Sequence, residues 1–170
     1  MESRISGSAI SQLTIKAGTL TMRTPLPGNE LECAEKIMEI TVAANNSTQR
    51  MLVSMGEIDD HCFTPWEAAY HKKHSVSIEN SFTLGAVLFI MLFHRPPERQ
   101  EMTLHRQIDY STSAFELSDG FALAADDYLR HSLAISPACR CVADDLLAIA
   151  DKLVEEAEKS NSQTQKTSMI

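Results

Sequence analysis

The chain is poor in glycine: its 170 residues include only six. Loops that cradle phosphates and turns that open dinucleotide sites depend on glycine, because the backbone must approach the ligand closely. Neither pattern is present, and the sequence also lacks a Gly-x-Ser-x-Gly elbow and a His-Glu-x-x-His helix. These absences argue against nucleotide-dependent enzymes, and we expect a chain that is not an enzyme and needs no cofactor.

Cysteine is scarce as well, with four residues in the chain. Four are too few to indicate a disulfide scaffold at this length. Residues 1–11 contain one arginine and no long apolar run, so they do not resemble a secretory signal. We therefore expect reduced thiols and a cytoplasmic protein.

Long apolar runs are also missing. The most apolar segment, 82–93, is shorter than the roughly 20 residues that a membrane-spanning helix needs. It is better explained as a buried core element, and we expect no membrane association. The net charge of -8 disfavours nonspecific binding to nucleic acid or anionic lipid.

The negative charge is unevenly distributed along the chain. The stretch 68–110 carries five bases and four acids, whereas the flanking parts are acidic. Two interpretations remain open: ordinary solvated helix faces, or a cationic rim on an acidic body that would suit an acidic partner or self-association.

Composition and patterning predict one globular domain over residues 12–158, with a flexible leader at 1–11 and a flexible tail at 159–170. Two alternating runs, 13–16 and 19–22, flank Ala17-Gly18 and predict a short β-hairpin. Asn29, with Glu32 three residues later, predicts a helix that either stops at 45–46 and restarts after Ser47 or runs through to Met55, before Gly56.

Three further helix starts are indicated by capping residues. Thr64, followed by a proline and then Glu67, predicts a short helix over 65–74. Ser113 with Glu116 predicts a second start, and Ser136 before a proline predicts a third. The last two helices should pack as an antiparallel hairpin. An apolar seam on the final helix is either core or a homodimer interface; it comprises Val142, Leu146, Ile149, Leu153 and Ala157.

The segment 82–93 is ambiguous, because a short apolar run suits either a buried helix or a central strand. We favour a helix, capped at Asn80 or Ser81, since β-branched residues are sparse. The predicted fold class is therefore mainly α: a compact helical domain with a short N-terminal β-hairpin. The alternative is an α+β fold with strands near 86–93 and 101–110.

One cluster contains metal-ligating residue types: His61 and Cys62, followed by His71 and His74. The last two are three residues apart on a predicted helix and so share a face, and imidazole and thiolate both suit Zn²⁺. The spacing matches no standard zinc signature, and the alternative is a solvated helix end. A metal-dependent or Cys/His enzyme or sensor at this cluster is the second functional hypothesis.

Trp66, close to Phe63, is a candidate anchor for a protein partner, although it could equally close the core. Cys139 and Cys141 form a Cys-x-Cys pair that would chelate poorly, because on a helix the two thiols point in different directions.

Paired acids on the last two helices allow a third hypothesis, an inhibitor that mimics nucleic acid. The first hypothesis remains a small, acidic, non-enzymatic protein that binds another protein: an inhibitor, immunity factor, chaperone or regulatory subunit. It rests on the missing catalytic motifs and the acidic faces.

Overall fold

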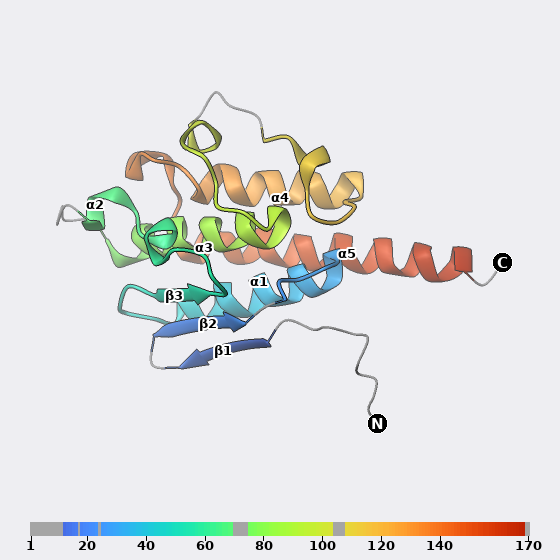
Figure 1. Ribbon diagram of the computed structural model, residues 1–170, viewed down its shortest axis with the longest axis horizontal. Coiled ribbons are helices and arrows are strands. Elements are labelled where there is room, and N and C mark those ends of the chain that lie inside the picture. The colour runs from blue at the N-terminus through green and yellow to red at the C-terminus, as the bar shows by residue number, and fades with distance from the viewer. Residues whose placement is uncertain (1–11, 17, 24, 70–74, 104–107, 169–170) are drawn as a thin grey trace.

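The computed structural model describes residues 12–168, except 17, 24, 70–74 and 104–107. Four helices are its main elements: α1 (Glu30–Asn45), α3 (Val76–Phe93), α4 (Asp119–Ser132) and α5 (Leu146–Ser168). α1 packs on α3, α3 on α4, α4 on α5 and α5 on α1, so the helices close into a four-helix ring (Figure 1). The predicted mainly α fold is confirmed.

The small sheet lies beside α1 at the N-terminal end of the chain (Figure 1). β1 (Gln12–Lys16) and β2 (Thr19–Arg23) form the predicted antiparallel hairpin, and Gly18 adopts φ 79° at its turn, a conformation open to glycine. A third strand, β3 (Leu52–Met55), pairs with β2 in parallel. α1 is therefore the crossover between two parallel strands.

β3 corrects both predictions for residues 47–55, a helix that restarts after Ser47 and a helix that runs through to Met55. Asn29 caps α1 as expected, since its side-chain oxygen accepts a 2.8 Å hydrogen bond from the Glu32 N–H. The helix ends at Asn45, at the first of the two predicted stops. Val53 and Met55 are buried in the core whereas Leu52 and Ser54 are exposed, and this period of two fits a strand with one buried face.

α3 is a helix over its whole length and is almost entirely buried, which rules out a strand at 86–93. It begins at Val76 behind a Ser75 cap, five residues before the predicted start. The polar residues of its first turns bind neighbouring segments: Asn80 accepts from the Met51 N–H at 2.8 Å, and Thr83 donates to the Phe63 carbonyl at 2.8 Å. These contacts satisfy buried polar groups and extend the helix beyond its apolar run.

By length and composition α3 alone among the described helices could span a membrane, with a mean hydropathy of 1.7. Most of that window, 78%, is buried inside the protein, as in the core helix of a globular fold. The alternative α+β fold also predicted a strand near 101–110. The described residues of that segment, 101–103 and 108–110, contain no strand.

α3 and α4 approach closely at Gly85. A Cβ there would lie 2.5 Å from the Ser132 hydroxyl and 2.9 Å from the Leu133 nitrogen, so only glycine fits without a shift. α4 itself begins after Ser118, whose backbone N–H donates to the Glu30 carboxylate at 2.5 Å. The predicted start at Ser113 is wrong, because that hydroxyl instead donates to a carbonyl two residues on.

The predicted start at Ser136 is also wrong for the long helix. It opens only a short 3₁₀ turn, η5 (Pro137–Cys139), and a second turn, η6 (Ala143–Asp145), precedes α5. α4 and α5 do pack as an antiparallel hairpin (Figure 1). α5 continues past residue 159 to Ser168, so the helix does not end where the tail was predicted to start.

The apolar seam of α5 belongs to the core of one chain. Leu146, Leu153 and Ala157 are buried, and Ile149 packs against the same cluster. Val142, at the start of the seam, is 38% exposed. A homodimer would therefore need a different surface.

Candidate functional site

A pocket of about 520 Å³ lies beside the segment that carries the predicted site residues. It is bounded by η2 (Asp60–Phe63), α2 (Trp66–Ala69), the start of α3 and η3 (Arg99–Met102). That volume falls in the range of ligand sites, roughly 300–1,000 Å³. Its lining is mainly apolar and comprises His61, Cys62, Thr64, Trp66, Phe82, Pro97, Arg99, Met102 and Ile135.

Trp66 forms one wall in a fixed orientation. Its indole Nε1 donates a 2.7 Å hydrogen bond to the Ile135 carbonyl, although 42% of the residue remains exposed. The polar edge of the ring is thus bound to the protein, while much of its apolar surface faces out. An exposed aromatic ring held in this way needs little ordering when it binds a partner.

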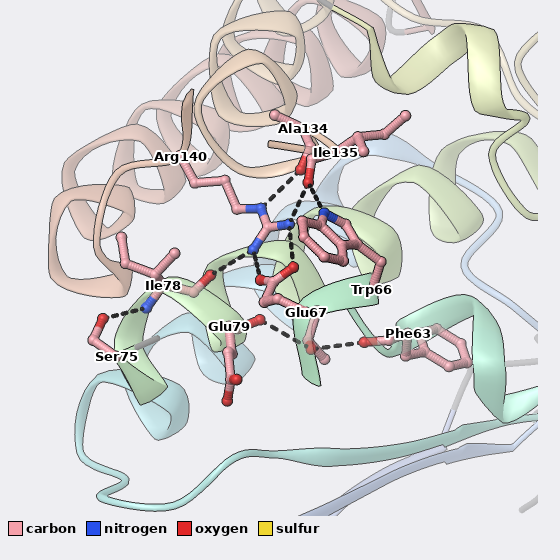
Figure 2. Close-up of polar contacts among 10 residues, drawn as sticks. Phe63, Trp66, Glu67, Ser75, Ile78, Glu79, Ala134, Ile135 and Arg140 are labelled. Carbon is pink, nitrogen blue, oxygen red and sulfur yellow. Dashed lines mark hydrogen bonds and ion pairs between the residues drawn. The ribbon is translucent and has the colours of Figure 1, made fainter. Parts of the chain in front are cut away.

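Directly behind Trp66, Glu67 forms an ion pair with Arg140 (Figure 2). The side chains of both residues are fully buried. The contact has two arms: Nη1 donates to Oε1, and Nη2 donates to Oε2 at 3.2 Å. These two parallel hydrogen bonds fix the orientation of the guanidinium plane, and the carboxylate neutralises the guanidinium charge.

The Arg140 guanidinium also binds the segment between α4 and α5. Nε donates to the Ala134 carbonyl at 2.8 Å, and Nη2 donates to the Ile135 carbonyl at 3.0 Å (Figure 2). Its carbon lies 4.9 Å from the centre of the Phe82 ring, a cation–π contact. Three pocket walls, at Trp66, Phe82 and Ile135, are therefore held by one buried network.

This network corrects the predicted capping box at Thr64. Within the described part of the chain the Glu67 carboxylate binds Arg140 and not the cap nitrogen. α2 begins at Trp66, one residue after the predicted start at Pro65, and the predicted end of that helix lies outside the described residues.

His61 stands at the mouth of the pocket with 93% of its side chain exposed. Its Nδ1 lies 2.8 Å from Asp59 Oδ1, and this hydrogen bond raises the pKa of the imidazole above its ordinary value. In turn, hydrogen bonds from the His61 backbone and ring lower the pKa of Asp59. Cys62 is partly buried, and its burial raises the pKa of its thiol, which therefore stays protonated near neutral pH.

The predicted metal cluster is divided by the limits of the described chain. His61 and Cys62 are neighbours on η2, but His71 and His74 lie outside the described residues. Within the described residues, no three histidine, cysteine or acidic side chains gather as a metal site would need. A zinc site at this cluster stays a prediction.

The structure separates the two predicted partner-binding aromatics. Phe63 is 3% exposed and belongs to the core, so it offers no surface to a partner. Trp66 remains available. Sequence reasoning missed Arg140, which it treated only as the spacer between Cys139 and Cys141. No local pattern links that arginine to a glutamate so far away along the chain; the pairing is set by the fold.

The acidic pairs that suggested nucleic-acid mimicry are partly compensated by cations. Asp126 pairs with Arg130 at 2.7 Å, and Glu156 pairs with both Lys152 at 3.2 Å and Lys159 at 3.0 Å. These acids do not form an uncompensated row, so their arrangement adds no support to the mimicry hypothesis.

No protein-family model matches the sequence, and no curated protein matches it either. The function must therefore be argued from the site itself.

Proposed function

We propose that this chain is a small regulatory protein that acts by binding another protein, with the pocket beside Trp66 as its contact surface. One observation carries the proposal: an exposed tryptophan is held by a hydrogen bond at the edge of an apolar pocket. Tryptophan is enriched among the residues that dominate binding energy in protein interfaces, and such residues pair with pockets.

The buried network behind the pocket supports this function. Arg140 and Glu67 fix the walls before a partner arrives, which reduces the ordering cost of binding. We also propose that the protein acts in the cytoplasm, since its thiols are free in the structure and a reducing compartment would keep them so.

Affinity capture from the native cell tests the proposal, with each captured protein then purified and titrated against the chain. Trp66→Ala should weaken the binary complex at least tenfold, the loss typical of a dominant interface residue. Leu123→Ala is the matched control, because Leu123 is an apolar residue of α4 that is 73% exposed and lies outside this pocket.

Both variants should keep the circular dichroism spectrum of the parent chain. Equal binding by the parent and both variants would show that the Trp66 surface is not the contact. A complex lost only with Leu123→Ala would transfer the contact to α4.

A further inference from the structure

The pocket beside Trp66 is chemically unlike the chain as a whole. The protein carries a net charge of -8, yet none of the described residues that line the pocket is acidic. Its walls are apolar, and its ionisable edge consists of Arg99, His61 and the Cys62 thiol. Because Arg99 is positively charged, this edge of the pocket favours an anionic occupant over a cationic one.

Arg99 is the cation that is free to bind an occupant. It is exposed on η3, and it makes no ion pair or hydrogen bond within the described part of the chain. Nearby arginines are already paired. Arg95 donates to both oxygens of Glu101 at 2.8 Å, and Arg140 is committed to Glu67.

The open mouth of the pocket indicates a macromolecular occupant. Sites for small molecules usually enclose 70–90% or more of their ligand. Here Trp66 is 42% exposed and the His61 side chain is 93% exposed. A small molecule inside the pocket would therefore leave much of the rim in contact with solvent. A segment of another protein can fill the pocket with one side chain and cover the rim with its neighbours.

Resting on the proposed function, we infer that the occupant is a protein segment in which a large apolar side chain is flanked by aspartate or glutamate. The apolar side chain fills the space between Trp66, Phe82 and Met102. The flanking carboxylate binds the Arg99 guanidinium, whose planar donors match a carboxylate with two bonds.

The single tryptophan of the chain makes the inference directly testable, because its emission reports on this pocket alone. Three short peptides of equal length serve as probes: phenylalanine and leucine among glutamates, the same peptide with glutamine for glutamate, and the glutamate peptide with serine for its apolar residues. Dodecanoate serves as the small-molecule probe.

The glutamate peptide should shift the Trp66 emission and bind about tenfold tighter than the glutamine peptide, as expected for one charge-assisted pair. The serine peptide should not bind. Arg99→Glu should remove the preference for glutamate. Lys16→Glu makes the same charge change on β1, away from the pocket, and should retain that preference.

Equal binding of the glutamate and glutamine peptides, or an unchanged preference in Arg99→Glu, would overturn the inference. So would a response to dodecanoate and to none of the peptides, which would assign the pocket to a small apolar acid. A captured partner that depends on Trp66 but is indifferent to Arg99→Glu would leave the proposed function standing and refute only this inference.

Discussion

The buried pair of Glu67 and Arg140 allows a quantitative prediction for the variant Arg140→Met. Within the described chain the Glu67 carboxylate has hydrogen bonds from Arg140 alone, and neither side chain has any exposure. Removing the guanidinium leaves a carboxylate buried without a partner. We expect the free energy of unfolding to fall by about 3–5 kcal/mol, the usual cost of breaking a buried pair from one side.

The reverse variant, Glu67→Met, should cost less. Without Glu67 the guanidinium keeps its bonds to the carbonyls of Ala134 and Ile135 and its contact with the Phe82 ring. The double variant should be less destabilised than the sum of the two single variants. We expect a coupling of about 1–3 kcal/mol, since the two side chains are in direct contact.

Urea unfolding followed by far-UV circular dichroism measures these free energies. The melting temperature should fall by about 2–4 °C for each kcal/mol lost. Arg130→Met is the matched control, because Arg130 is 67% exposed and pairs with Asp126 on one helix face. That variant should leave the free energy of unfolding almost unchanged, because water screens an exposed pair. The reasoning is refuted if Arg140→Met costs no more than Arg130→Met, or if the two single effects simply add.

Three more outcomes are expected. The pKa of His61, followed by NMR, should lie above 6.5 and return toward it in Asp59→Asn; the contribution of this contact to stability is present at low pH and is lost as the pH rises through the raised pKa. Gly85→Ala should destabilise the protein by about 1–3 kcal/mol through overpacking, whereas Gly28→Ala, which meets open space, should be nearly neutral; unfolding curves of equal midpoint would contradict this. The fully buried Cys33, whose pKa burial raises, should resist alkylation in the native protein while the partly exposed thiols react, and mass spectrometry of the labelled peptides shows the order.

The hairpin and α1 could be predicted from the sequence because their signals are local. Gly18 sits at the turn, and Asn29 has the backbone and hydrogen bonds of an N-cap. The starts at Ser113 and Ser136 failed for a related reason. A serine side chain can bind several nearby backbone groups, and in the folded protein other contacts decide which bond forms.

The functional site depends on contacts that no local pattern encodes. Glu67 resembled part of a capping box, yet its partner is Arg140, and Trp66 binds a carbonyl at Ile135. β3 was missed for the same reason, because a four-residue strand is specified mainly by pairing with β2. Sequence reasoning did locate the segment that forms one side of the pocket, through Trp66 and the neighbouring His61.

The burial of α3 has a consequence for synthesis of the protein on the ribosome. This apolar helix leaves the exit tunnel before α4 and η6, which cover it in the folded chain. Roughly 50 residues separate the end of α3 from the end of η6, which corresponds to about 3–10 s at translation rates of about 5–20 residues per second. During that interval the nascent chain exposes a segment long and apolar enough to resemble a membrane span, so its early encounters with chaperones and targeting factors are set by the order in which its helices are made.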